Sequence, residues 1–150
     1  MTGPLQDQNV LVIGRGGGLA RAITIAARDA GARVTAAGRD QRALAAAYAG
    51  EPGITTETVD LTDEASIAAL GKRLDTVGHV VSTASARARG RVPDLDRDAI
   101  RLSFDTKVIG PLMLAKHLAP RMTGGGSFVL FSGVAAAKIT VGTQIGRAHV

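Results

Sequence analysis

The sequence predicts a single α/β domain built on a doubly wound parallel sheet of five strands. Short apolar segments rich in β-branched residues alternate along the chain with segments in which apolar residues recur every three or four positions. Apolar residues make up 45% of the 150 residues but aromatic residues only 3%, so the core must consist mainly of Ala, Val, Ile and Leu. Such a core is typical of a parallel sheet covered by helices on both faces.

The chain between residues 9 and 82 predicts strands and helices in strict alternation. Each strand segment is short and apolar, and each helix segment carries apolar residues on one face. Gly31 marks the end of the first helix, and Asp40 and Asp63 stand where a side chain would cap the second and third helices. The predicted strands are 9–13, 33–37, 54–59 and 79–82, and the predicted helices are 19–30, 40–49 and 63–74.

A longer helical pattern begins at Asp96 and continues to Leu118. Pro111 falls inside this pattern, and proline fits the first turn of a helix but damages an interior. We therefore predict two helices that meet near Gly110, followed by a glycine loop at 124–126 and a fifth strand at 127–131. Because crossover connections are right-handed in nearly all such units, the strands should form one parallel, doubly wound sheet.

Composition also limits the classes of function. The chain contains no cysteine, which excludes disulfides and thiolate metal sites, and we expect no metal centre. The N-terminal segment MTGPLQDQ is polar and no apolar run reaches the length of a membrane span, so we expect a cytoplasmic protein without a membrane partner. The formal charge of +5 comes with scattered arginines and few aromatic residues, so we expect no binding to nucleic acid.

The strongest chemical signal is the segment VIGRGGGLARA at 12–22, which joins the first strand to the first helix. A dinucleotide pyrophosphate needs a tight turn, close approach of the backbone and the positive end of a helix. A glycine run alone also fits an ordinary flexible turn, but its place between a strand and an amphipathic helix favours a phosphate site. The residues expected at this site are Gly14, Arg15, Gly16, Gly17, Gly18 and Leu19.

The end of the second strand indicates which nucleotide is bound. Sites for NAD or S-adenosylmethionine usually place an acidic residue there to accept hydrogen bonds from the ribose, whereas here Arg39 comes first and Asp40 follows. A guanidinium group matches the 2′-phosphate of NADP, and Arg15 could add a second charge to the same phosphate. We therefore predict NADP(H) as the cofactor and disfavour a methyltransferase. The alternative for Arg39 is a solvated surface arginine, whereas Asp40 is assigned as the cap of the following helix.

These features resemble the short-chain dehydrogenase/reductase family over about residues 8–142. The family's glycine motif, TGxxxGxG, corresponds here to Ile13, Gly14, Gly18 and Ala20, with Ile13 and Ala20 in place of the usual Thr and Gly. The resemblance implies a Rossmann-like fold that is incomplete in this chain, because the family fold continues with a further helix, two strands and a substrate lid.

The resemblance also assigns residues after the third and fourth strands. The family's Asp-Leu pair is present as Asp60-Leu61, and Asp60 would accept a hydrogen bond from the adenine amino group. The alternative for Asp60 is a turn residue near the helix cap at Asp63. The family's NNAG segment appears as STAS at 82–85, and the backbone of Thr83, Ala84 and Ser85 would line the cofactor ribose.

The catalytic positions of the family are where this sequence departs from it. Members typically use an Asn, a Ser, and a Tyr with a Lys four residues later. The Asn position falls on Lys107, which could hold the helix kink or be a solvated lysine. The usual serine pair reads Ser132-Gly133, which leaves Ser132 as the candidate catalytic hydroxyl, with a strand-end serine as the alternative. The Tyr-x-x-x-Lys pair is absent, and the lone tyrosine, Tyr48, is expected to serve packing.

The last six residues, IGRAHV at 145–150, resemble the translation of a sequencing-adapter stretch. We therefore expect the NADP(H)-binding domain to occupy residues 1–144 and the tail to be non-native. A chain that lacks the family's later helix and strands would expose apolar surface, so we expect it to be marginally stable or to aggregate.

The leading functional hypothesis is an NADP(H)-dependent oxidoreductase acting on a carbonyl or alcohol, represented by a fragment that is inactive alone. The alternative is a non-catalytic protein that holds NADP(H) as a sensor or scaffold, as Lys107 and Gly133 would permit. The apolar stripe at 104–118 permits a homo-oligomer in the parent protein, although core packing explains the stripe equally well.

Overall fold

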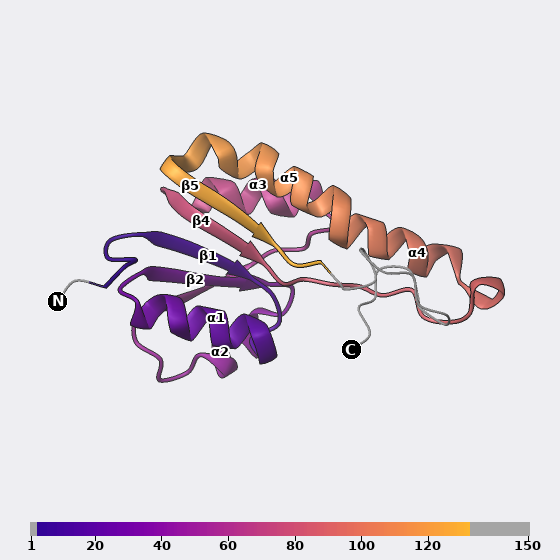
Figure 1. Cartoon of the computed structure of the whole chain (residues 1–150), viewed down its shortest axis with the longest axis horizontal. Helices are drawn as coiled ribbons and strands as arrows, with labels where there is room; N and C mark the ends of the chain where they lie inside the picture. Colours follow the sequence, from indigo (N-terminus) through magenta and orange to yellow (C-terminus); the bar gives the residue numbers. More distant parts are fainter. Residues whose placement is uncertain (1–2, 133–150) are drawn as a thin grey trace.

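The computed structural model describes residues 3–132, and its centre is a sheet of five parallel strands in the order β3-β2-β1-β4-β5. Helices cover both faces of the sheet (Figure 1). This arrangement confirms the predicted doubly wound α/β fold. Gly133 and the predicted tail at 145–150 lie outside the described residues. The strands are β1 (Asn9–Ile13), β2 (Arg33–Gly38), β3 (Ile54–Thr58), β4 (Val77–Ser82) and β5 (Met122–Leu130).

The helices follow the predicted order. Asp40 and Asp63 cap α2 and α3 as expected, each by accepting a hydrogen bond from a backbone N–H in the first turn. The helices are α1 (Gly18–Asp29), α2 (Gln41–Ala47), α3 (Glu64–Arg73), α4 (Arg97–Phe104) and α5 (Gly110–Leu118), with short helical turns η1 (Val92–Asp94), η2 (Asp105–Ile109) and η3 (Ala119–Arg121).

Helices α1 and α2 cover one face of the sheet (Figure 1). The buried positions of α1 are Ala20, Thr24 and Ala27, whereas Leu19, which begins the predicted apolar pattern, is 52% exposed. Small side chains let the helix lie close to the strands. The buried Thr24 hydroxyl is paired, because it donates to the Ala20 carbonyl at 2.8 Å. The buried face of α1 is therefore formed by Ala20, Thr24 and Ala27 and does not include Leu19.

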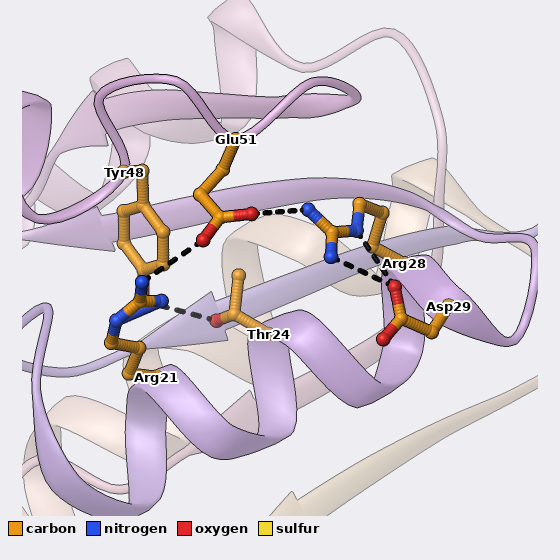
Figure 2. A network of polar contacts seen from close by, with 6 residues as sticks. All are labelled: Arg21, Thr24, Arg28, Asp29, Tyr48 and Glu51. Atoms are coloured by element: carbon orange, nitrogen blue, oxygen red, sulfur yellow. Dashed lines mark hydrogen bonds and ion pairs between the residues drawn. The ribbon is translucent and has the colours of Figure 1, made fainter.

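A polar network ties α1 to the end of α2 and the turn before β3 (Figure 2). Glu51 accepts hydrogen bonds from the guanidinium groups of Arg21 at 3.0 Å and Arg28 at 2.6 Å. Tyr48 is buried, and the Arg21 guanidinium group lies against the face of its ring. The Tyr48 hydroxyl donates to the Thr24 hydroxyl at 3.3 Å. This placement confirms the expected packing role of Tyr48.

The other face is covered by α3 and α5, which form the largest apolar cluster with Leu11 and Ile13 of β1 and Val77 and Val80 of β4. Gly110 is buried at the start of α5, and a Cβ there would lie 2.7 Å from the Leu61 carbonyl oxygen. The helix can approach the end of β3 this closely only because residue 110 is glycine.

The break expected near Gly110 is instead a π-helical turn, η2, that keeps the helical run continuous from α4 into α5 (Figure 1). Pro111 has no N–H and cannot bond the carbonyl four residues back, so the helix widens before it. The Gly110 N–H donates to the Asp105 carbonyl, five residues earlier.

The glycines at 124–126, which were expected to form a loop, lie within β5, where the strand is irregular. Val77 pairs with Met122, but His79 pairs with Ser127, so the register shifts between these two pairs. Gly125 has a φ of 82°, which favours glycine. The strand therefore begins earlier than its apolar segment indicated.

Candidate functional site

The candidate site is a crevice of about 1580 Å³ at the carboxyl ends of the strands. The arrowheads of β1, β2, β4 and β5 point to this end of the sheet in Figure 1. The order of the strands changes side at β1, since β2 and β3 lie on one side of β1 while β4 and β5 lie on the other. Ligands of open α/β sheets bind at such a switch point. The predicted residues that line the crevice are Gly14, Arg15, Gly16, Gly17, Leu19, Arg39, Asp60, Leu61, Thr83, Ala84, Ser85 and Ser132.

The glycine loop forms one wall of the crevice. Gly17 is the N-cap of α1 and provides no side-chain cap, and the first turn of α1 carries no acidic residue. The N–H groups at this end of the helix are therefore available to an anion. A Cβ on Gly17 would meet nothing within 4 Å, so its absence leaves open space on the crevice side of the loop.

The other glycines of the loop serve packing and backbone geometry. A Cβ on Gly14 would contact Thr83 Oγ1 and lie 2.7 Å from Ala20 Cβ, and a Cβ on Gly16 would lie 2.7 Å from Ala47 Cβ. Gly18 is the one predicted loop residue that does not line the crevice. Its φ of 54° shows that it provides the left-handed turn into α1.

Two arginines extend from the β1 and β2 ends of the crevice. Arg15 and Arg39 are exposed, and neither takes part in the ion pairs found among residues 3–132. Asp40, beside Arg39, is occupied as the cap of α2, since its carboxylate accepts from the Ala43 N–H at 2.9 Å. At the end of β2 the Asp40 carboxylate is therefore engaged by the start of α2, whereas the Arg39 side chain lines the crevice.

Asp60 stands where β3 leads into α3. Its carboxylate accepts hydrogen bonds from the Thr62 N–H at 2.9 Å and the Thr62 hydroxyl at 2.7 Å. The backbone hydrogen bond from Thr62 lowers the pKa of Asp60, and the charge of Arg39 acts in the same direction. Asp60 thus forms the turn named above as its alternative role and also lines the crevice.

The end of β4 is fixed to the end of β1. The Thr83 N–H and hydroxyl both donate to the Ile13 carbonyl, at 2.9 and 3.1 Å. Because this hydroxyl is engaged, Thr83 holds the floor of the crevice beside Gly14, and Ala84 and Ser85 continue the wall.

Ser132 and Lys107 lie at the opposite end of the crevice from Arg39, after β5 and on η2. Ser132 is exposed, so its hydroxyl is accessible from solvent. Lys107 is half-buried, and its Nζ donates to the Phe131 carbonyl at 2.9 Å. Burial lowers the pKa of Lys107, and the nearby charge of Arg87 lowers it further. The solvated lysine considered above is therefore wrong, because the side chain links η2 to the end of β5.

Sequence reasoning missed the segment after β4, where Arg87 and Arg89 also line the crevice. Between them, the buried Ala88 N–H donates to the buried Ser103 hydroxyl of α4 at 2.8 Å. The available signal was the alternation of arginine and alanine in SARARG at 85–90, directly after the predicted ribose segment.

Among residues 3–132, no cluster of three or more His, Asp or Glu side chains could hold a metal ion. None of the helices described there combines the length and apolarity needed to cross a membrane.

Comparisons with known proteins agree with this geometry. A family profile described as enoyl-(acyl carrier protein) reductase matches residues 14–148. The 2-keto-3-deoxy-L-fuconate dehydrogenase of Xanthomonas campestris pv. campestris is 34% identical over 134 residues, which cover 88% of this chain and 45% of that protein. Dehydrogenase/reductase SDR family member 7B of Bos taurus is 32% identical over 75% of this chain and 39% of its own length. The chain thus spans less than half the length of these curated relatives.

Solved structures show the same likeness. A short-chain type dehydrogenase/reductase from Mycobacterium ulcerans superposes with a TM-score of 0.82 and 31% sequence identity. The match covers 91% of this chain and 55% of that one.

Proposed function

The chain belongs to the short-chain dehydrogenase/reductase family, whose members usually bind NAD or NADP, and we propose that its crevice binds NADP(H). The whole protein would transfer a hydride between the nicotinamide and a carbonyl or alcohol substrate. The reaction class is supported by the Xanthomonas relative, which is named a dehydrogenase. The choice of NADP(H) over NAD depends on Arg39, the cation at the end of β2 where an NAD site usually has an acid.

The residues of the crevice fit such a cofactor. The open side of Gly17 and the uncapped start of α1 would hold the pyrophosphate. Arg39 and Arg15 would hold the 2′-phosphate, since each is exposed, lines the crevice and forms no direct ion pair among residues 3–132.

The remaining contacts would come from the ends of β3 and β4. The Asp60 carboxylate is held beside Arg39, where it would accept from the adenine amino group, and Leu61 would line the same part. The backbone of Thr83, Ala84 and Ser85, which line the crevice, would contact the ribose, and such a role would permit side chains other than those of NNAG. Gly18 would act only through the turn that begins α1.

At the other end of the crevice, Ser132 is the candidate for orienting the substrate oxygen. The cofactor supplies the hydride, and the chain must therefore supply groups that position the carbonyl and pass a proton. Ser132 is exposed at the end of the crevice that contains Lys107, and Lys107 holds the Phe131 carbonyl next to it. The proton donor of the family, a tyrosine, has no counterpart after Tyr48 in this sequence. We therefore expect the chain to bind the cofactor without turnover.

A titration of the 150-residue chain with NADPH, NADH and S-adenosylmethionine tests the proposal. Fluorescence of the reduced nicotinamide reports the first two ligands, and calorimetry reports all three. We expect saturable binding of NADPH, weaker binding of NADH and none of S-adenosylmethionine. Equal or tighter binding of NADH would remove the assigned role of Arg39, and failure of both nicotinamide cofactors to bind would refute the proposal.

A further inference from the structure

The crevice carries a second group of cations, toward the opposite end of the sheet from Arg39. Arg87, Arg89 and Lys107 line the crevice beside the ends of β4 and β5, whereas Arg39 follows β2. The strand order places β1 and β4 between β2 and β5. With neighbouring strands about 4.8 Å apart, β2 and β5 are separated by roughly 14 Å. Arg39 and this second group of cations therefore lie toward opposite ends of the crevice.

No Asp or Glu side chain of the part that the structure describes pairs with these cations. The sequence has 13 Asp and Glu residues, all between positions 7 and 105 and so within the described part. None of them forms an ion pair with Arg87, Arg89 or Lys107 there. Arg91, in the same loop, is different because it pairs with Asp94 at 3.3 Å and does not line the crevice.

The backbone that carries these cations is held by the fold. The segment after β4 runs along α4 (Figure 1), and the buried hydrogen bond from Ala88 to Ser103 fixes the residue between the two arginines. Lys107 is fixed by its bond to the Phe131 carbonyl. Burial lowers the pKa of Lys107, and the positive charge of Arg87 lowers it further. An anion between Arg87 and Lys107 would relieve the repulsion between these two cations.

We propose that Arg87, Arg89 and Lys107 form the anion-binding part of the substrate site, so that the substrate is a carbonyl or alcohol compound bearing a carboxylate or phosphate group. This inference rests on the proposed function, because it needs the nicotinamide at the same end of the crevice. Ser132 lines that end too, so an acidic substrate can place its reacting oxygen at Ser132 and its anionic group against the arginines. Guanidinium groups match carboxylate and phosphate equally well, and the two are distinguished by experiment.

The test measures binding of matched probes to the full 150-residue chain by ligand-observed NMR, with and without saturating NADPH. One pair is 2-hydroxybutanoate and its methyl ester, and the other is glycerol 3-phosphate and glycerol. We expect at least one anion to bind more tightly than its neutral partner. Arg87→Gln and Arg89→Gln should each weaken that anion about tenfold or more. Arg91→Gln is the matched control and should leave the affinity unchanged, because Arg91 is paired with Asp94.

The outcomes separate this inference from the proposed function. Equal binding of anion and neutral partner, or no binding of either anion while NADPH binds, would overturn the inference and leave the cofactor assignment intact. Loss of NADPH affinity in Arg87→Gln or Arg89→Gln would also overturn it, because these cations would then belong to the cofactor site. Selective anion binding by a chain that binds no nicotinamide cofactor would support the anion site but refute the proposed function.

Discussion

Gly17 is the residue at which a binding role can be separated from a folding role. Its φ of −140° and ψ of 175° suit any residue, and an added Cβ would point into open space. Gly17→Ala should therefore keep the thermal stability of the chain while a methyl group occupies the place proposed for the pyrophosphate. We expect NADPH affinity to fall at least about tenfold.

The neighbouring glycine provides the contrast. Gly14→Ala would place a Cβ against Thr83 and Ala20, so it should lower the Tm as well as the affinity. Gly124→Ala, in open space away from the crevice, is the control and should change neither. Undiminished NADPH binding by Gly17→Ala would argue against a phosphate site at this loop.

Asp60 gives a prediction about pH. Its folded-state pKa lies below the ordinary value of 3.8 because the Thr62 N–H donates to the carboxylate. A lowered folded-state pKa contributes stability above the unfolded value, and this contribution is lost as pH falls through the folded-state pKa. Asp60→Asn keeps an oxygen acceptor but does not titrate. The free energy of unfolding of the wild type relative to Asp60→Asn should thus be constant above about pH 5 and fall below it.

Urea unfolding of both proteins at several pH values checks this prediction. A difference in stability that is independent of pH would show that Asp60 titrates at its ordinary pKa.

At the residue scale, the sequence identified the positions whose role depends on local chemistry. Asp40 and Asp63 could be assigned as caps because a cap needs only its own helix. Arg87 and Lys107 could not be assigned, because their role depends on how η2 and the loop after β4 meet in space. The alternation of arginine and alanine at 85–90 marks that loop, but it does not show which side chains the loop meets.

At the scale of elements, the alternation of strand and helix was predictable because the apolar period changes from two to about 3.6 at each boundary. The π-helical turn η2 was not predictable from that period, since apolar residues recur in the same way through it. Pro111 predicts a break in the helix, but the π-helical turn η2 accommodates the hydrogen bond that the proline cannot donate. The start of β5 was missed because its glycines have no strand signature, and pairing with β4 determines their conformation.

The junction of α1 with the turn before β3 gives a prediction at this scale. Glu51 is partly buried and accepts from two guanidinium groups (Figure 2), whereas Asp94 forms an exposed pair with Arg91. Exposed pairs contribute little to stability. Glu51→Gln should lower the Tm by a few degrees, and Asp94→Asn should leave it nearly unchanged. Equal effects in thermal unfolding would show that the Glu51 network does not stabilise this junction.

At the scale of the whole molecule, apolar side chains remain exposed along α4 and α5. Phe104, Val108 and Leu112 are 49%, 46% and 61% exposed, and Leu130 at the sheet edge is 51% exposed. Contiguous exposed apolar surface promotes association. We expect the chain to self-associate at micromolar concentration, as measured by size-exclusion chromatography with light scattering. The double substitution Phe104→Lys and Leu112→Lys should shift it toward monomer.

Val92→Lys is the control for that experiment, because Val92 is 78% exposed but belongs to η1 and to neither α4 nor α5. A wild-type chain that stays monomeric at all concentrations, with a reversible cooperative thermal transition, would contradict the expected association.

The central claim is that the crevice of this family member selects NADP(H) through Arg39. The most direct measurement is the ratio of the NADH and NADPH dissociation constants for wild type, Arg39→Ala and Arg33→Ala. Arg33 is the control because it stands at the amino-terminal end of the same strand, β2, where its guanidinium group donates to the Asn9 side chain. Loss of one charge-assisted pair costs roughly 1.5–3 kcal/mol, so Arg39→Ala should weaken NADPH by about ten- to a hundredfold and leave NADH unchanged. If Arg39→Ala weakened both cofactors equally, or neither, the claim would be wrong.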